Sequence, residues 1–319
     1  MMRILRTLAG TVATAWLATM AHAQMVGIMT TPAGSFSNSA GSAIAKVLNE
    51  KANVRAVVQA QASTGFEAVE ANNVEFNLSN SFDATFFATG TGDYAGTGVK
   101  KNFRHVASLI PYRVAMHVRA DSDIKSIADL KGKRVASGFN TQKTIERIIE
   151  AHLANAGLTY KDVIQVPVPN VVKEAEDFTS GKVDVLFFAL GSAAVKQAAA
   201  SVGGLRVLEV DSSPEAVKRI QKILPGAYIL KINPAPNLDG ITKPTNVVAF
   251  DMVMNSTATV SDDLVYRIVK AIYENKKDLV ATFRPFALFQ PANMAKPVEG
   301  VEFHPGAVKF YKEVGIWKQ

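Results

Sequence analysis

The sequence predicts an α/β protein in which two lobes flank a central cleft. Short β-like runs alternate with segments of helical periodicity, and this alternation indicates βα units and mostly parallel sheets. The alternation begins near Val26 and begins again near Asp129, with long extended segments elsewhere. The 296 residues that follow residue 23 (319 − 23) also suit two domains of about 100–150 residues each.

The first part of the chain repeats the order strand, polar loop, helix. After a β-like run and a loop of small residues, apolar side chains recur at helical spacing between Ala43 and Leu48. A second strand and loop lead to Phe66 and Val69, which predict another helix. Strands are expected at 26–29, 54–59 and 75–78, and polar loops at 30–38, 62–65 and 79–81.

The second part of the chain has the same order. A strand that ends at Ala136 leads into a loop at 137–142, and the helix that follows has an apolar stripe from Ile145 to Leu153. Gly157 stands where such a helix is expected to end. Further strands are expected at 165–168 and 183–188, with a short helix at 172–178 between them.

Two extended segments, 106–118 and 246–254, are expected to cross between the lobes. Two crossings would form a hinge, at 112–118 and 247–252, and the ligand cleft would lie between two α/β sheets. The last segment of the chain carries an amphipathic helix that Ser261 is expected to cap. The expected divisions are a signal peptide at 1–23, a first lobe at 24–116 and 249–319, and a second lobe at 117–248.

The first 23 residues have the features of a bacterial secretory signal peptide. Arg3 and Arg6 precede an apolar run at 8–20, and Ala21-His22-Ala23 fits a small-x-small cleavage site. The alternative is a membrane anchor, but the run is short for a span of about 20 residues and contains three threonines. We therefore expect export to the periplasm, with cleavage before Gln24.

The composition excludes several classes of protein. The chain has no Cys, which excludes disulfides, a lipoprotein anchor, thiolate metal sites and a cysteine nucleophile. Its net charge of +7 falls to +5 when Arg3 and Arg6 are removed (33 basic minus 28 acidic residues). The excess lies in short, separate clusters, so we expect no nucleic-acid partner.

Polar loops carry the candidate ligand-binding residues. In open α/β sheets the ligand lies beyond the carboxyl ends of the strands, where hydroxyl and amide side chains meet free helix N–H groups and form a neutral anion site. The alternative is that these side chains only cap helices. Four such loops in matching positions favour a binding site. The candidates are Ser35, Phe36, Ser37, Thr64, Gly65, Asn80, Ser81, Asn140, Thr141, Lys143 and Thr144, with Phe36, Phe139 and Phe188 as apolar walls.

Signals for catalysis are weak. The four histidines that follow residue 23 have no metal-ligand spacing, and the sequence contains no G-x-S-x-G nucleophile motif. The glycine-rich segment 90–96 matches neither a phosphate-binding loop nor a dinucleotide fingerprint. We therefore expect no catalytic residue, no metal site and no cofactor.

Longer phrases carry a family resemblance. With its segments 118–135, 261–266 and 304–311, the chain resembles the TAXI group of TRAP-transporter solute receptors from about Val26 to Ile316. The resemblance implies a type II periplasmic-binding fold that closes on a small organic acid or amino acid, such as glutamate or 2-oxoglutarate. It also implies a sodium-coupled TRAP transporter as membrane partner, and ligand contacts from the region between Phe188 and Gly191.

Two loops depart from the family pattern. The first loop lacks the usual pair of tyrosines, and the loop at 139–144 lacks the usual Gly-Ser-Gly-Thr. We therefore expect Lys143 to offer a cationic partner for a carboxylate, and Phe36 and Phe139 to favour a less polar acid. Two alternatives stay open: a ligand-sensing protein that reports to a membrane kinase, and an enzyme on the same fold.

Overall fold

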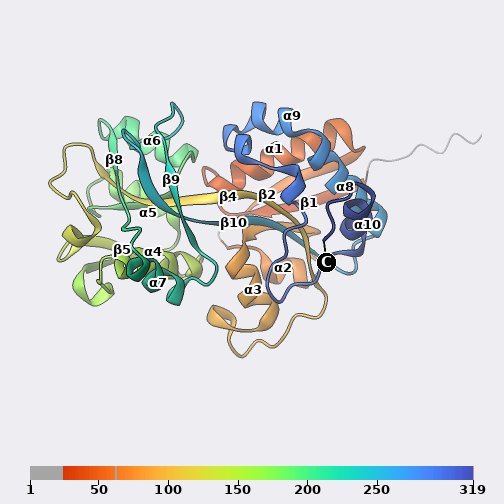
Figure 1. The fold of residues 1–319 in the computed structure, drawn as a ribbon, viewed down its shortest axis with the longest axis horizontal. Coiled ribbons are helices and arrows are strands. Elements are labelled where there is room, and N and C mark those ends of the chain that lie inside the picture. Colours follow the sequence, from red (N-terminus) through yellow and green to blue (C-terminus); the bar gives the residue numbers. More distant parts are fainter. Residues whose placement is uncertain (1–23, 62, 319) are drawn as a thin grey trace, which may run out of the picture.

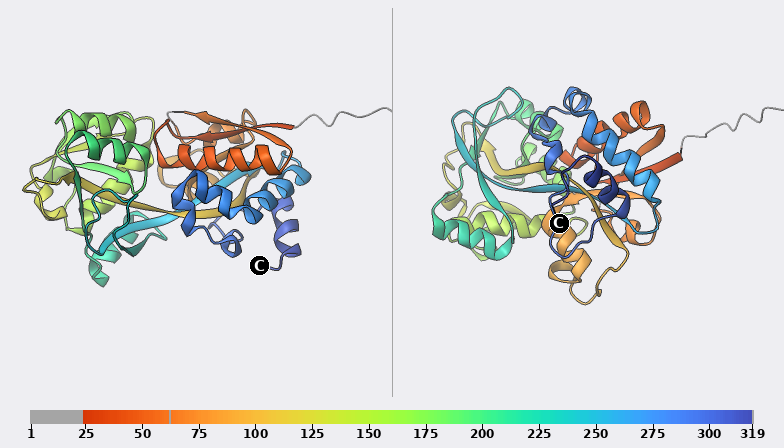
Figure 2. Two further views of the ribbon diagram at one scale, coloured as in Figure 1. Left: turned by 90° about the horizontal axis from the view of Figure 1, so that it is seen from above. Right: turned by 45° about the vertical axis from the view of Figure 1, so that its right-hand side comes forward.

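The computed structural model describes residues 24–61 and 63–318 and forms two lobes that lie side by side (Figure 1). The expected signal peptide lies outside the described residues. Two long strands, β4 (Phe103–Arg119) and β10 (Thr245–Thr257), run through both lobes. The two further views in Figure 2 show the same pair of strands between the lobes. The predicted two-lobed α/β architecture is confirmed.

The strands form one continuous sheet of eight and one separate pair. In the large sheet the order is β2-β1-β3-β10-β4-β7, with β8 added to β4 and β9 added to β10; β5 and β6 pair with each other. The first lobe has parallel pairs of β1 with β2 and β3, whereas β4 and β10 run antiparallel to their neighbours. The remaining strands are β1 (Gln24–Thr30), β2 (Val54–Ala60), β3 (Phe76–Asn80), β5 (Arg134–Gly138), β6 (Ile164–Val168), β7 (Leu186–Ala189), β8 (Leu205–Leu208) and β9 (Tyr228–Ile232).

This continuity differs from the two separate sheets that we expected. The 17 residues of β4 span about 55 Å at ~3.3 Å per residue, which is enough to pair with strands of both lobes. β4 pairs with β7 and β8 in the second lobe, and with β10 over most of its length. The crossing strands therefore belong to the sheets of both lobes and join them into one.

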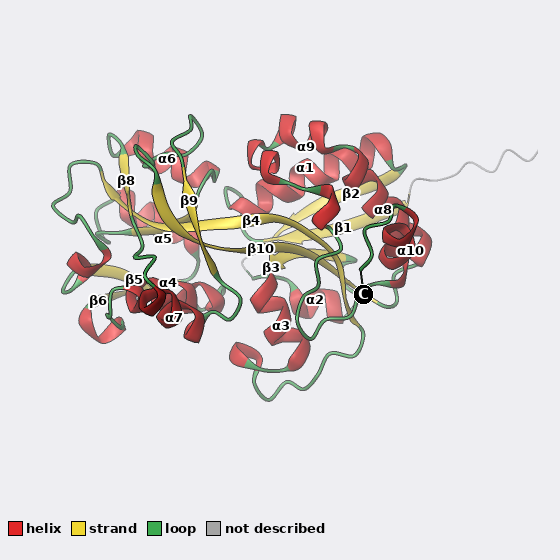
Figure 3. Cartoon of the chain, viewed as in Figure 1, coloured by secondary structure: helices red, strands yellow, loops and turns green. Residues whose placement is uncertain are grey.

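Helices cover the sheet on both sides. Figure 3 shows α1 and α9 on one side of the first-lobe strands and α2 and α3 on the other. No helix among the described residues is both long and apolar enough to cross a lipid bilayer. The helices are α1 (Phe36–Lys51), α2 (Phe66–Glu70), α3 (Ser81–Thr89), α4 (Lys143–Asn155), α5 (Val171–Thr179), α6 (Ala193–Ser201), α7 (Pro214–Ile223), α8 (Asp262–Glu274), α9 (Lys276–Thr282) and α10 (Pro305–Glu313); short 3-10 turns include η1 (Gly92–Tyr94) and η4 (Arg284–Leu288).

The two segments expected to form the hinge are hydrogen-bonded neighbours. Val248 of β10 pairs with Val114 of β4, and the register continues to Asp251 opposite Pro111. A register shift follows Asp251, and proline has no N–H to donate, so the ladder is interrupted at this point. An interrupted ladder is a place where two strands can bend together, and the proposed hinge and domain boundaries stay predictions.

Candidate ligand-binding site

A cavity of about 80 Å³ lies between the lobes, where the N-terminal ends of four helices meet. Ser35 caps α1 and Asn80 caps α3 in the first lobe, while Gln142 precedes α4 and Val171 begins α5 in the second. All four residues line the cavity. The first N–H groups of a helix have no partner within the helix, and each of these ends carries the positive end of the helix dipole. Capping side chains accept the N–H groups of Asn38, Asp83 and Val171, and the first-turn N–H groups without such a partner remain as donors.

Seven of the residues predicted from the polar loops line this cavity. Five come from the first lobe and two from the second, so the structure brings loops from both lobes together. They are Ser35, Phe36, Ser37, Thr64, Asn80, Thr144 and Phe188. Their contact with a ligand stays a prediction.

The other seven predicted residues do not line the cavity. Phe139 is fully buried, at a φ of 29°, and belongs to the apolar core. Lys143 is exposed at the first position of α4, and Thr141 donates its hydroxyl to the carbonyl of Pro169 at 2.7 Å. Asn140 is exposed. The remaining three also lie outside the cavity wall: Gly65 precedes α2, Gly191 lies in a turn, and Ser81 is the first residue of α3.

The structure adds lining residues that were not among the predicted ligand contacts, although some lie in the predicted loops. Tyr112 and Phe250 come from the crossing strands, and Gln142 from the loop before α4. Alternation along β4 could have identified Tyr112 and Val114 as one face of a strand. The other added residues are Thr31, Leu78, Ser79, Ile145, Ile148, Val171, Phe187 and Ala189.

Three hydroxyl groups gather at the start of α1. The Thr31 hydroxyl donates to Ser35 Oγ at 2.8 Å and lies 2.6 Å from Ser37 Oγ. Ser35 Oγ also accepts the N–H of Asn38 at 3.2 Å, which is an N-cap contact. Ser35 therefore caps a helix and lines the cavity, so capping and a ligand contact are compatible at this position.

Gln142 joins the starts of α4 and α5. Its side-chain oxygen accepts the N–H of Val171 at 3.0 Å, which leaves the amide N–H groups to the cavity. The side-chain nitrogen of Gln142 has no hydrogen-bond partner among the described residues. A fixed donor on a buried residue is suited to an oxygen of a ligand.

Aromatic rings form the apolar wall. The ring of Phe36 lies 5.2 Å from that of Tyr112, and the Phe250 ring lies 5.5 Å from Tyr112 and 4.9 Å from Phe82 (centroid distances). Burial raises the pKa of Tyr112, partly offset by a hydrogen bond with Ser37, so its hydroxyl stays protonated and can donate. The wall therefore combines large apolar surfaces with neutral donors.

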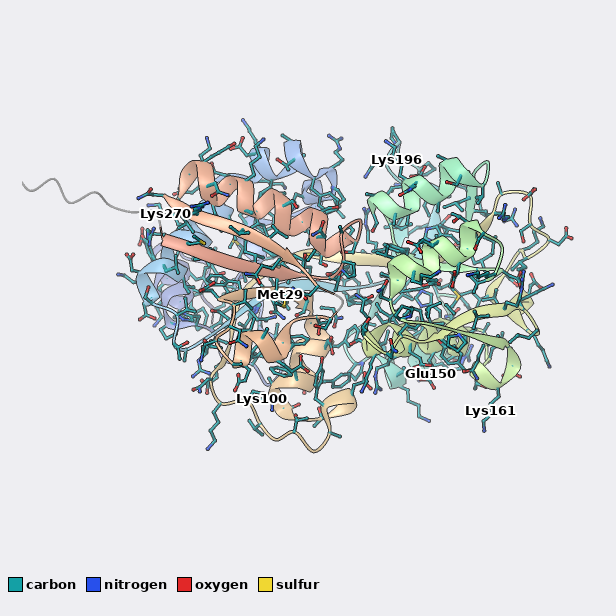
Figure 4. The ribbon with its side chains drawn as sticks, turned by 180° about the vertical axis from the view of Figure 1, so that it is seen from behind. Met29, Lys100, Glu150, Lys161, Lys196 and Lys270 are labelled. Carbon is teal, nitrogen blue, oxygen red and sulfur yellow. The ribbon has the colours of Figure 1, made fainter. Side chains whose placement is uncertain are left out.

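No charged side chain, that is no Lys, Arg, Asp or Glu, lines the cavity in the described part of the chain, 24–61 and 63–318. Figure 4 shows Lys100, Lys161, Lys196 and Lys270 toward the outside of the molecule. A cavity without charges has a low local dielectric, which strengthens the hydrogen bonds formed in it.

A buried carboxyl group lies directly behind Thr144. Asp83, in the first turn of α3, is fully buried, and its Oδ2 accepts the Thr144 hydroxyl at 2.8 Å. Its Oδ1 has no partner among the described residues. Burial is the main cause that raises the pKa of Asp83 to about 7, and the hydrogen bond from Thr144 lowers it in part.

Contacts between the lobes close the cleft around the cavity. The Asp83–Thr144 hydrogen bond joins α3 to α4, and an ion pair of 2.6 Å joins Asp93 to Arg147. On the opposite side the N–H of Ala194 donates to the carbonyl of Gly34 at 3.3 Å. The structure therefore has the lobes in contact on two sides of the cavity.

The histidines are separate from the cavity. His105, His117, His152 and His304 are all fully buried, and burial lowers the pKa of each, to about 4 for His105 and His117. None lines the cavity wall in the described part of the chain. Among the same residues no group of three or more His, Asp or Glu side chains is arranged to hold a metal ion.

Solved structures share this fold at low sequence identity. The periplasmic binding protein BugD is 13% identical over 93% of this chain and 99% of its own, with a TM-score of 0.60. A periplasmic transporter structure is 14% identical over 94% of each chain, with a TM-score of 0.59. The alkanesulfonate-binding protein SsuA from Xanthomonas axonopodis pv. citri, bound to MOPS, is 13% identical over 94% of this chain and 96% of its own, with a TM-score of 0.52.

These similarities establish the two-lobed type II fold of periplasmic binding proteins, which the sequence predicted. The family comparison goes further than the fold. The NMT1-like family matches residues 28–315, which is nearly the whole described chain, and this protein therefore belongs to the NMT1-like family.

Proposed function

We propose that this protein is a periplasmic receptor that captures a small carboxylate between its lobes and delivers it to a membrane transporter. The observation that carries the proposal is the cavity where four helix N-terminal ends converge among neutral donors and aromatic rings. Donors and helix dipoles of this kind stabilise an anion without a countercharge.

The hydrogen-bond donors and helix ends around the cavity can account for binding of an acid with micromolar affinity. A helix N-terminus stabilises an exposed anion by about 0.3–1 kcal/mol, and by up to ~2 kcal/mol where the anion is partly buried. Hydrogen bonds to a charged group contribute about 1.5–3 kcal/mol each. Two helix ends with the Gln142 amide and the Tyr112 hydroxyl could therefore supply much of the ~8 kcal/mol that corresponds to micromolar binding.

The wall favours an acid with a compact apolar body. Phe36, Tyr112 and Phe250 surround the space, and the described lining has no cation for a second carboxylate. A monocarboxylate therefore suits the cavity better than glutamate or 2-oxoglutarate, which the family resemblance implies. The test therefore includes monocarboxylates as well as glutamate and 2-oxoglutarate.

The proposed membrane partner is a sodium-coupled TRAP transporter. The resemblance to TAXI receptors supports this choice. The lobes close over the ligand, and a closed surface that differs from the open one would let the transporter recognise the loaded form. A gene for a many-span transporter subunit beside the receptor gene supports this partner, and a gene for a sensor kinase there supports the sensing alternative.

A sulfonate is the second candidate ligand. The fold is similar to that of an alkanesulfonate-binding protein bound to MOPS. Sulfonate oxygens accept the same hydrogen bonds as a carboxylate, so the same helix ends could hold either group. Ethanesulfonate therefore joins the panel of acids.

The test is a thermal-shift screen of protein from residue 24 onward, unfolded and refolded to remove bound molecules. The panel contains benzoate, pyruvate, 2-oxoglutarate, glutamate and ethanesulfonate, with benzamide as the uncharged control for benzoate. A ligand at 100 times its dissociation constant stabilises by about 2.7 kcal/mol, which raises the melting temperature by several degrees. Stabilisation by benzoate and not by benzamide supports the proposal, and no shift with any acid contradicts it.

A further inference from the structure

The Asp83 carboxyl group is buried against a wall of the proposed ligand site. Its Oδ2 accepts the hydroxyl of Thr144, which comes from the opposite lobe and lines the cavity. Its Oδ1 is buried without a hydrogen-bond partner among the described residues. A buried carboxylate with an unsatisfied oxygen is costly, so this group favours a neutral, protonated state or a partner that arrives with the ligand.

The groups that surround Asp83 do not supply a countercharge. Asp93 and Tyr94 face it from η1, and Glu67 faces it from α2; the charges of Asp93 and Glu67 raise its pKa further, and a hydrogen bond from the neutral Tyr94 hydroxyl lowers it in part. Arg147 of α4 interacts weakly with the charge of Asp83, but its guanidinium pairs with Asp93 and packs on the Phe86 ring at 5.2 Å. Asp83 itself forms no salt bridge in the described structure. Protonation is therefore the available way to neutralise it.

The protonation state of Asp83 sets what Thr144 offers to a ligand. An ionised Asp83 accepts the single hydroxyl proton of Thr144, so Thr144 presents only lone pairs to the cavity. A protonated Asp83 can donate to Thr144 Oγ1, and the Thr144 hydroxyl then turns its proton to the cavity. A carboxylate binds well only in the second arrangement, because lone pairs repel its oxygens.

We propose that the closed protein takes up one proton at Asp83 when it binds a carboxylate. The proton moves from solvent to Oδ2 of Asp83, Asp83 donates to Thr144, and Thr144 donates to the ligand; no covalent bond changes. Two carboxylates separated by one hydroxyl in a cavity without cations disfavour each other's charge. By linkage, the proton and the acid then strengthen each other's binding. This inference rests on the proposed function, since it needs an acid in the cavity.

The test is calorimetry with benzoate and pyruvate as probes at pH 8. Titration in imidazole and in Tris, two cationic buffers that differ in ionisation enthalpy, gives the number of protons taken up on binding. We expect about one proton, and a dissociation constant that rises about tenfold per pH unit above the pKa of Asp83. Neither measurement needs a variant. Binding with no proton uptake and a constant affinity from pH 6 to 9 would overturn the inference and leave the proposed function intact.

Two variants locate the proton. Asp83→Asn cannot titrate, and its side-chain amide can donate permanently to Thr144, so we expect pH-independent binding with no uptake. Glu174→Gln is the matched control, because Glu174 is another fully buried carboxyl group, on α5, whose Oε1 accepts the N–H of Phe187. This control should keep the uptake of one proton. Uptake retained by Asp83→Asn would contradict the inference, and no binding of either acid would instead reject the proposed function.

Discussion

Tyr112 of β4 lies directly opposite Phe250 of β10, and both rings line the cavity between the lobes. The same register places Asp251 opposite Pro111, next to the interruption of the strand pair. The segment expected to bend therefore also lines the cavity. A ligand that packs against these two rings would contact both crossing strands at once, and we expect such a contact to couple occupancy of the cavity to the geometry of the predicted hinge.

Replacement of Gln142 by Glu should weaken acid binding. The carboxylate can still accept the N–H of Val171, so the starts of α4 and α5 stay joined, but the amide donor is replaced by a negative charge. The loss of a hydrogen bond to a charged group is worth about 1.5–3 kcal/mol, so we expect benzoate to bind about 10- to 100-fold more weakly by calorimetry. Gln197→Glu, at an exposed position of α6, is the control. Equal affinity of wild type and Gln142→Glu would remove Gln142 from the site.

Replacement of Arg147 by Ala should favour the open form. Its ion pair with Asp93 and its contact with the Phe86 ring are contacts between the lobes, each worth up to about 1 kcal/mol at such partly exposed positions. We expect three- to tenfold weaker binding of benzoate and a larger radius of gyration in solution. Lys51→Ala, which breaks an ion pair of 3.9 Å between α1 and α9, should change neither. A radius of gyration that is unchanged in Arg147→Ala would argue against this role.

Replacement of Lys143 by Ala tests whether this lysine is a cationic partner for a carboxylate ligand. The sequence suggests a cationic partner for a carboxylate, whereas the side chain is exposed and does not line the cavity. We expect the affinity for benzoate to change less than twofold, because exposed charges are screened by salt. Affinity that falls tenfold or more would support the cationic partner and would mean that the loop rearranges around the ligand.

Much of the fold could be predicted from the sequence because its signals are local. The apolar, β-branched character of β4 and β10 identified both crossing strands, and helical spacing identified α1, α4 and α8. The single continuous sheet was missed because it depends on pairing between distant segments. No local pattern in β7 or β8 indicates that both pair with β4.

The lining of the cavity could be predicted at the level of loops, but only half of the named side chains line it. The polar loops were found because the ends of strands and the starts of helices have recognisable residues. Side-chain direction depends on register, and a shift by one residue exchanges the two faces of a strand. Tyr112 thus lines the cavity while Arg113 is buried elsewhere, and a turn with positive φ directs Phe139 into the core.

Replacement of Gly65 by Ala should destabilise the protein for a structural reason. Gly65 has a φ of 76°, and a Cβ there would overlap the side chain of Met29, which lies near the middle of the molecule in Figure 4. Gly132→Ala is the matched control, with a φ of 71° and no atom within 4 Å of the new Cβ. We expect the conformational strain to lower the free energy of unfolding by about 1 kcal/mol in both variants. Overpacking against Met29 should lower it by a further ~1–3 kcal/mol in Gly65→Ala alone. If urea denaturation shows the same loss of stability in Gly65→Ala and Gly132→Ala, the Met29 side chain moves aside without cost.

The fully buried His117 should make the protein less stable as the pH falls. Burial lowers its pKa to about 4, whereas the unfolded chain takes up the proton near pH 6.5. Between these two pH values the unfolded state binds more protons than the folded state. The contribution of His117 to the free energy of unfolding therefore falls as the pH falls, by about 1–2 kcal/mol from pH 7 to 5. Asp83 has the opposite sign: its pKa is raised to about 7, so the folded state binds the extra proton and gains stability over the same range.

Because the two signs oppose each other, the informative quantity is the difference between wild type and His117→Leu. We expect the variant to lose stability at pH 7, where the hydrogen bond from His117 to the Leu186 carbonyl is removed, and to recover 1–2 kcal/mol relative to wild type at pH 5. Urea denaturation at both pH values measures this difference. Val118→Ala, the neighbouring buried position on β4, should show the same deficit at both. If the free energy of unfolding lost in His117→Leu is the same at pH 7 and pH 5, the pKa of His117 is the same in the folded and the unfolded chain, and the prediction is wrong.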